Sequence, residues 1–179
     1  MRASSITICA LSGFLVACGF AARKEAHQFI STHFHSQHSD LGHLQILAPC
    51  QFARVEKREI PGGPPLGPSQ IAGTDEYSVA VSFDPSYVSQ WGSAAPSKSQ
   101  VEPAFEGLGK DREVHLENIT LDGHPGVLAS TTALGFDKPA WTVIYFGANG
   151  LMIQASGSDT RETTRQVCEE TIRSVKFDH

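Results

Sequence analysis

The chain lacks the sequence features by which most catalytic classes are recognised. Its 179 residues contain no Gly-Xaa-Ser-Xaa-Gly elbow, no His-Glu-Xaa-Xaa-His pair, no Walker-type phosphate loop and no dinucleotide-binding fingerprint. It also lacks an apolar run of the ~20 residues that a membrane-spanning helix needs. These absences favour a protein that is not an enzyme, uses no nucleotide cofactor and has no permanent transmembrane helix.

What the first residues do contain is an export signal. Arg2 supplies a positive start, residues 6–17 are almost wholly apolar, and the first acidic residue is Glu25. A charged start followed by an apolar stretch of about a dozen residues is typical of a signal peptide. We therefore predict that residues 1–17 are removed and that the rest of the chain is exported.

The end of this segment, Leu15-Val16-Ala17-Cys18, resembles the lipobox of bacterial lipoproteins. The resemblance implies that Cys18 is acylated, with palmitate among its fatty acids, and becomes the mature N-terminus. Gly19 after the cysteine then implies a periplasmic protein anchored to the outer membrane. Several acyl chains hold a protein on a membrane stably, whereas one binds only marginally. Ordinary secretion, with cleavage near Ala17 or Ala22, is the alternative.

The exported part is of single-domain size and mildly acidic. Removing 17 of 179 residues leaves 162, and the loss of Arg2 leaves 13 basic and 19 acidic residues, a net charge of −6. A length of this order fits one domain. Because nucleic-acid binding relies on clustered Lys and Arg, we expect no nucleic-acid partner.

Two cysteines remain after export. Cys9 lies in the removed segment and Cys18 in the lipobox, so Cys50 and Cys168 are left in an oxidising compartment, where thiols pair. We predict a Cys50–Cys168 disulfide, which on the chain-entropy model contributes on the order of 4–5 kcal/mol. The alternative, a reactive thiol, needs a cationic neighbour or a nearby second cysteine that the sequence does not show.

Residues 18–43 are predicted to be a lipid-anchored, histidine-rich tether, since they hold five of the eight histidines. Neutral imidazole binds zinc and copper well. The candidate metal ligands are His33, His35, His38 and His43. Two alternatives stay open. The tract is a soluble spacer, because no Cys or carboxylate stands at a recognised zinc spacing, or Phe29, Ile30 and Phe34 dock a short helix on the domain.

Residues 44–179 are predicted to form a single α+β domain. Apolar and polar residues alternate in about six segments, which predicts a mainly antiparallel sheet. The predicted strands are 44–52, 77–83, 112–121, 126–133, 141–146 and 151–155. Asp122-Gly123 and Asn149-Gly150 suit the positive backbone angles of tight hairpins. The Pro- and Gly-rich residues 61–68 predict a long loop.

Helices are predicted in two places. An irregular connection, with a turn of helix near 101–105, is predicted between the first helix and the strand that follows it. Asp84-Pro85 begins a short helix over 86–91. Asp159 and Glu162 begin a C-terminal helix whose apolar stripe should pack on the sheet. A last short strand is predicted at 174–177.

Two hairpins and a helix ending in Ile172-Arg173-Ser174-Val175-Lys176-Phe177, on an exported lipoprotein, resemble the PsbP-like α/β/α sandwich group. The resemblance covers roughly residues 112–177 and includes the Gly-Xaa-Pro-Gly turn at 123–126. It implies a sheet with a C-terminal helix packed on it. It also implies a non-enzymatic function, because members of that group are mostly binding or assembly proteins.

Three functions follow as expectations. The leading one is a lipid-anchored envelope protein that binds another envelope or secreted protein, as an accessory factor or as an immunity protein that neutralises a toxin. The second is a zinc- or copper-binding lipoprotein that uses the four histidines named above. The third is a hydrolase. Its catalytic groups would come from His115, His124, Asp122, Asp159 and Ser156, which we interpret as surface polar residues. The aromatic residues Trp91, Trp141 and Tyr145 are interpreted as core rather than as a ligand site.

Overall fold

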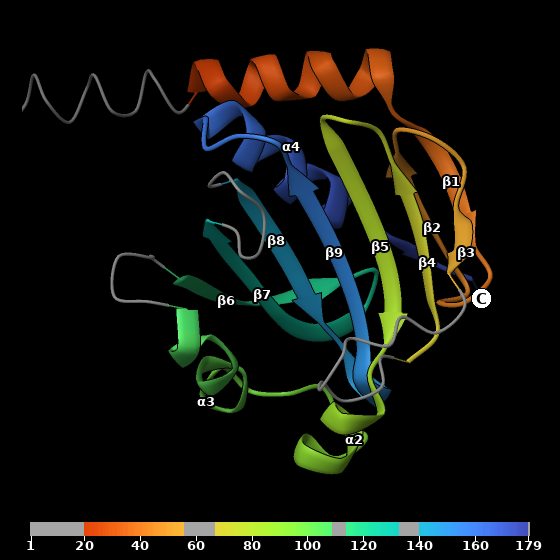
Figure 1. The fold of residues 1–179 in the computed structure, drawn as a ribbon, viewed down its shortest axis with the longest axis vertical. Helices are drawn as coiled ribbons and strands as arrows, with labels where there is room; N and C mark the ends of the chain where they lie inside the picture. Colours follow the sequence, from red (N-terminus) through yellow and green to blue (C-terminus); the bar gives the residue numbers. More distant parts are fainter. Residues whose placement is uncertain (1–19, 56–66, 109–113, 133–139, 179) are drawn as a thin grey trace, which may run out of the picture.

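Two antiparallel sheets organise the computed structural model, which describes residues 20–55, 67–108, 114–132 and 140–178 (Figure 1). The main sheet has seven strands in the order β3-β4-β5-β9-β8-β7-β6. Their bounds are β3 Ala53–Val55, β4 Ser69–Gly73, β5 Tyr77–Phe83, β6 Val114–Leu121, β7 His124–Thr132, β8 Trp141–Phe146 and β9 Leu151–Gly157. The small sheet has the order β1-β2-β10, with β1 His35–Ser39, β2 Leu44–Ala48 and β10 Lys176–Phe177.

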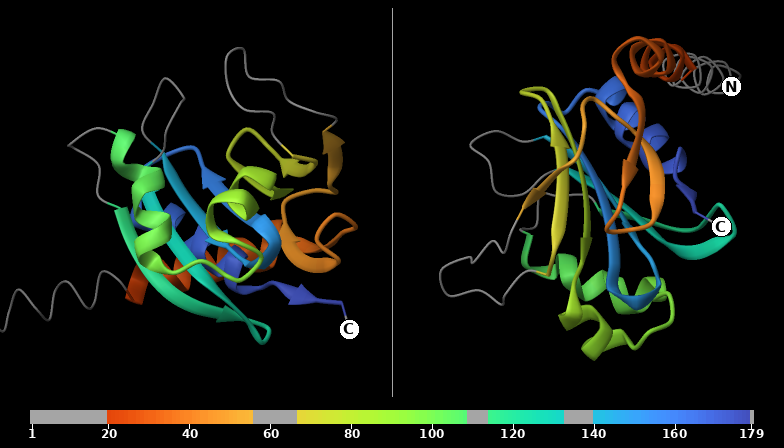
Figure 2. Two further views of the ribbon diagram at one scale, coloured as in Figure 1. Left: turned by 90° about the horizontal axis from the view of Figure 1, so that it is seen from below. Right: turned by 90° about the vertical axis from the view of Figure 1, so that its right-hand side faces the viewer.

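Helices cover both sides of the main sheet. On one side lie α4 (Glu162–Arg173), the small sheet and an N-terminal helix described over residues 20–33. On the other side lie α2 (Pro85–Trp91), α3 (Lys98–Val101) and the 3-10 segment Glu102–Leu108. Figures 1 and 2 show the N-terminal helix beside α4, at the opposite end of the molecule from α2.

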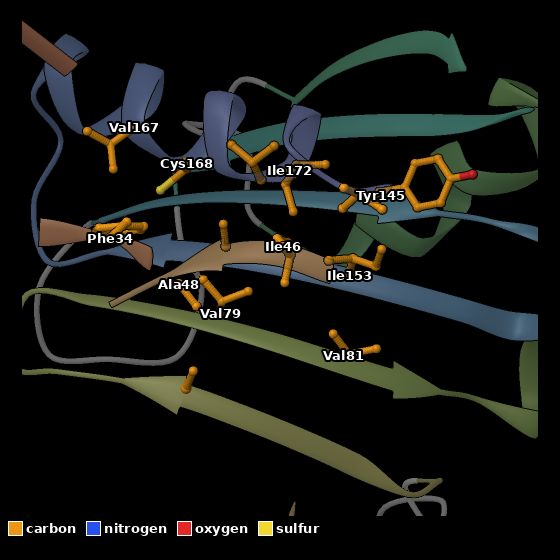
Figure 3. Packing of buried hydrophobic residues seen from close by; sticks show 14 of the residues in the cluster. Phe34, Ile46, Ala48, Val79, Val81, Tyr145, Ile153, Val167, Cys168 and Ile172 are labelled. Carbon is orange, nitrogen blue, oxygen red and sulfur yellow. The ribbon is translucent and has the colours of Figure 1, made fainter. Parts of the chain in front are cut away.

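Strand alternation divides the core into two clusters. In β5, β8 and β9 the odd-numbered residues, such as Val79 and Val143, face α4 and the small sheet. The even-numbered residues of β8, such as Phe146, face α2 and the 3-10 segment, and β7 has the opposite parity, with Val127 on this second face. Successive side chains of a strand point to opposite faces, so one apolar strand serves both layers. Figure 3 shows the larger cluster, in which Ile172 of α4 lies over the sheet.

Local signals set the turns as the sequence predicts. Asn149 and Gly150, which join β8 to β9, have φ of 56° and 74°. Asp122 has φ of 46° between β6 and β7. The Asp84 carboxylate accepts a hydrogen bond from the Ser86 N–H at 2.8 Å and caps α2. Because these residue types tolerate or require such geometry, the hairpins and the cap follow from sequence alone.

The predicted α+β class, with an antiparallel sheet and a packed C-terminal helix, is confirmed. Three details differ. The main sheet has seven strands rather than about six, the predicted strand 44–52 ends at Ala48, and a separate strand, β3, begins at Ala53 in the other sheet. Pro49 explains the break, because proline has no N–H to continue a strand ladder. Residues 61–66 of the predicted loop lie outside the described residues.

The predicted tether boundary is also corrected. Ala26, Ile30 and Phe34 belong to the larger core cluster, and Glu25 accepts a 3.0 Å hydrogen bond from the Thr163 hydroxyl of α4. Their spacing of four places one buried stripe along the helix. In the described structure the domain therefore includes residues 20–43, in agreement with the alternative of a docked helix. The predicted domain boundary at residue 44 is wrong. Residues 1–19, with the predicted signal peptide and Cys18, lie outside the described residues.

Candidate functional site

A hollow of about 620 Å³ opens between the N-terminal helix and the end of α4; we call it the helix groove. Its lining comes from the N-terminal helix, β2 and the segment around the end of α4: Phe20, Arg23, Lys24, His27, Ile30, Ser31, Leu47, Glu170, Arg173 and Ser174. The helix residues in this set are spaced by one, three or four and so form one stripe beside the buried stripe. Docking of the helix through one face thus leaves an adjacent face to line the groove.

Positive charge dominates the helix groove. Arg23, Lys24 and Arg173 line it, and Glu170 is the single carboxylate of the lining. Arg173 also donates a 2.9 Å hydrogen bond to Glu117, which lies outside the lining. Glu170 lies 3.8 Å from Arg23 and 3.6 Å from His27. Within the described part of the chain, Lys24 takes part in no ion pair. The groove is therefore suited to a negatively charged ligand.

Apolar surface accompanies this charge. Phe20, at the start of the described helix, is 75% exposed, and among the described residues Val88 is the only other large hydrophobic side chain in the exposed class. Ile30 and Leu47 form the apolar part of the groove. A cationic rim with an apolar floor is chemically matched to an amphiphilic anion.

A second hollow, of about 480 Å³, lies along strand β6; we call it the edge groove. It is lined by Ala94, Ala95, Pro96, Asn118, Ile119, Thr120, Pro125 and Gly126, none of which is charged. Among the described residues, strand β6 is the end strand of the main sheet and pairs only with β7. Such an edge presents backbone N–H and C=O groups that an added strand can pair with.

The four predicted metal ligands do not converge. His33 stacks on Phe29 at 4.3 Å between ring centroids, while His35 and His38 lie three residues apart on β1 and so point to opposite faces. His43 occupies the following turn with φ of 46°. No group of three or more His, Cys, Asp or Glu side chains suited to a metal occurs among the residues described here. The structure thus places the histidines apart and gives the metal interpretation no geometric support.

The predicted Cys50–Cys168 disulfide is absent from the structure, where both thiols are free. Cys50 Sγ lies 3.5 Å from the carbonyl oxygen of Gly73, to which it donates. Cys168 is 1% exposed within the larger core cluster, and burial raises the pKa of its thiol above the usual range. The two thiols thus lie in different environments in this structure, and their pairing in an oxidising compartment stays a prediction.

The polar residues considered for hydrolysis are dispersed as well. Ser156 shares a 3.2 Å hydrogen bond with Thr142 rather than with a histidine. Asp159 accepts hydrogen bonds from the Thr164 hydroxyl and from the N–H of Arg161. Burial alone would raise the pKa of Asp159, but these hydrogen bonds outweigh it and hold the pKa below its usual value. Asp159 therefore stabilises the start of α4.

The remaining hydrolase candidates lie in the β6–β7 turn or on the surface of the protein. The His124 ring lies 4.2 Å from that of Phe177, Asp122 accepts a 2.9 Å hydrogen bond from the Phe177 N–H, and His115 is exposed on β6. The pairs tie the β6–β7 turn to β10. Four of the five candidate residues thus hold separate parts of the fold together, and His115 is an exposed surface residue.

The three aromatic residues singled out from the sequence serve the structure. Tyr145 is buried, its hydroxyl donates to the carbonyl oxygen of Pro125 at 3.0 Å, and burial raises its pKa to about 12. Trp91 stacks on Tyr87 in the smaller core cluster. Trp141 lies under the guanidinium of Arg165, whose carbon is 5.7 Å from the ring centroid.

Sequence reasoning missed both grooves. The sequence does carry a signal for the helix groove, because residues 20, 23, 24 and 27 have helical spacing, but the composition of this segment predicts a tether. The edge groove had no local signal, because its walls come from residues 94–96 and from the β6–β7 hairpin.

The fold defines an antiparallel α+β domain with helices on both sides of the main sheet. Comparison with known structures finds a likeness to the solution structure of cyanobacterial PsbP (CyanoP) from Synechocystis sp. PCC 6803. The two are 12% identical, with a TM-score of 0.45, over 82% of this chain and 93% of that one. No family profile and no curated protein sequence matches the chain. No helix within the described residues is long and apolar enough to cross a membrane.

Proposed function

We propose that this protein is an exported lipoprotein, anchored through acylated Cys18, whose domain binds a protein partner without catalysing a reaction. The partner is another envelope or secreted protein, and the role is that of an accessory factor or of an immunity protein that neutralises a toxin. The observation that carries this proposal is the edge groove beside the long outer edge of β6, which no other strand pairs with among the described residues.

Strand β6 offers a receptor of suitable length. It spans eight residues, from Val114 to Leu121, whereas β3 at the opposite end of the sheet spans three. Within the described residues, the backbone of residues 118–120 forms hydrogen bonds only with β7. An extended segment of the partner would pair with this edge through its main chain, and alternate side chains would enter pockets beside it.

The lining of the edge groove indicates what such a segment contains. Ala94, Pro96, Ile119 and Pro125 supply apolar walls, and the only polar side chains of the groove are those of Asn118 and Thr120. We therefore propose an uncharged, extended segment of a partner as the ligand. The edge groove lies at the end of the sheet near the α2–α3 connection, away from the N-terminal helix that follows Cys18. An anchored domain can present this end to the aqueous phase.

Site-specific photo-crosslinking in the native cells tests the proposal. A crosslinking amino acid at Thr120 should capture one protein, whereas the same amino acid at His35, on the exposed edge strand β1 of the small sheet, should not. Ala94→Arg, at an exposed position of the edge groove, should abolish capture at Thr120 without lowering the melting temperature. Ser89→Arg on exposed α2 is the matched control.

Two further measurements make the test decisive. In the purified complex, amide hydrogen exchange of residues 118–120 should slow at least tenfold, because a paired strand edge is protected. Mass spectrometry should find an acylated Cys18 in the protein from native membranes, and Cys18→Ser should move the protein to the soluble fraction. Capture that persists in Ala94→Arg, or unchanged exchange in β6, would refute binding at this edge.

A further inference from the structure

We infer that the helix groove binds the anionic headgroups of a phospholipid surface and thereby fixes how the domain sits on its membrane. The inference goes beyond the proposed protein binding at the edge groove. It assigns a ligand class, the phosphate of an anionic lipid, to a surface formed by the N-terminal helix and α4.

The first support is the arrangement of charge. Arg23 and Lys24 lie side by side on the exposed stripe of the N-terminal helix, and Arg173 faces them from the end of α4. Glu170 is the single carboxylate of the lining and lies 3.8 Å from Arg23, and Arg173 is paired at 2.9 Å with Glu117, which is outside the lining. Lys24 is therefore the lining cation without an ion pair among the described residues, and the lining holds more cations than carboxylates on a chain whose overall net charge is −5. Cations near an anionic membrane surface each strengthen binding by about fivefold.

The second support is the exposed Phe20. At 75% exposure it is the most exposed large hydrophobic residue among those described, and it begins the same stripe that carries Arg23 and Lys24. Aromatic side chains flanked by Lys and Arg are typical of helices that lie in a membrane interface. An acidic protein partner would pair with the cations, but it would not explain why a large apolar side chain is exposed beside them.

The third support is position. Phe20 is two residues from Cys18, so acylation of Cys18 brings this end of the helix to the lipid surface whatever the orientation of the domain. In this respect alone, the inference rests on the proposed anchor. Two chain residues span at most about 7 Å, so the groove lies within reach of the headgroups. Anchor and groove together would turn the edge groove away from the membrane.

Lysine labelling of the full-length protein on vesicles tests this orientation. Acetylation of Lys24 should slow at least fivefold on vesicles of phosphatidylcholine with phosphatidylglycerol, relative to phosphatidylcholine alone. Lys98 and Lys176 act as internal controls in the same molecule, and their labelling should not change. Equal labelling of Lys24 on both vesicle types, or equal protection of Lys98, would overturn the inference.

A charge-matched pair of variants gives a second readout. In a Cys18→Ser chain, which cannot be acylated there, Arg23→Gln with Lys24→Gln should reduce the preference for phosphatidylglycerol vesicles about 25-fold, from about fivefold per cation. Arg54→Gln with Lys98→Gln removes the same charge from exposed positions elsewhere and should change it less than twofold. Equal effects of the two pairs would overturn the inference in favour of a general charge effect.

Further measurements distinguish a lipid headgroup from a soluble anion, and failure of the groove assignment from failure of the proposed anchor. If inorganic phosphate protects Lys24 as strongly as vesicles do, the groove holds a soluble anion and the membrane assignment is wrong. If mass spectrometry finds Cys18 without acyl groups while Lys24 is still protected on phosphatidylglycerol, the anchor fails and the groove assignment stands. If Cys18 is acylated and Lys24 is unprotected, the anchor stands and the groove assignment fails.

Discussion

Substitution of Ile30 tests whether the N-terminal helix is part of the fold. Ile30 is 4% exposed and belongs to the larger core cluster with Phe34. Ile30→Ala removes three carbon atoms, which at ~0.8 kcal/mol per buried methylene is about 2.4 kcal/mol of transfer free energy. A residual cavity adds to this, so we expect about 3 kcal/mol, inside the range of ~2–5 kcal/mol measured for such substitutions.

The measurement is equilibrium urea unfolding. A domain of this size has a free energy of unfolding of ~5–15 kcal/mol, so the variant still folds. With a urea dependence of ~2 kcal/mol per molar, the midpoint should fall by about 1.5 M at an unchanged slope. Gln28→Ala, on the exposed face of the same helix, is the control and should stay within ~0.5 kcal/mol.

Equal midpoints for Ile30→Ala and Gln28→Ala would refute the reasoning. The helix would then contribute nothing to stability, and residues 18–43 would be a tether, as composition alone predicts. The helix groove would lose one of its walls under that result, so this experiment also bears on the inferred membrane site.

Two other predictions concern single side chains. With both thiols free, iodoacetamide should label Cys50 in the native protein and Cys168 only after unfolding, since burial raises the pKa of the Cys168 thiol and shields it; peptide mapping that finds the two joined would restore the predicted disulfide. Hydrogen bonds from Thr164 and Arg161 hold the pKa of Asp159 in the folded protein below its unfolded value of ~3.9. The ionised carboxylate therefore stabilises the fold above pH ~3.9, and this stabilisation is lost as the pH falls through the folded pKa. Thermal unfolding should therefore show Asp159→Asn destabilised at pH 6 and closer to the parent protein at pH 3, and a difference that grows on acidification would contradict the assignment.

The elements that sequence predicts well are those whose signals are local. Residues 77–83 form β5 with the predicted bounds, because apolar and polar residues alternate without interruption. The Asn149-Gly150 pair sets its hairpin through backbone angles that those residues tolerate. In each case the information lies within a few residues, so no distant partner is needed to interpret it.

The elements that sequence misses depend on distant partners. The N-terminal helix buries small residues, Ala22 and Ala26, and the five histidines of residues 18–43 give that segment the composition of a spacer. Strand β4 carries only Ile71 and Ala72 as apolar signals, yet it pairs with β5 over five residues. Strand β10 was predicted, but its partner proved to be β2 of the second sheet.

The candidate sites were harder to predict for the same reason. Whether His35 and His38 converge depends on the backbone between them. A helix would place them on adjacent turns, and the observed strand places them on opposite faces. The helix groove joins residues such as Lys24 and Arg173, which are far apart in sequence and meet only through packing.

The larger core cluster contains both Ala26 and Val175, residues near the two ends of the described chain. Its packing can be completed only after Val175 has been synthesised, so the first helix of a nascent chain lacks its full docking surface until then. Under the proposed export, a chain of this design would still lack its larger core cluster when its first residues enter the export machinery, and that cluster would form only after transport.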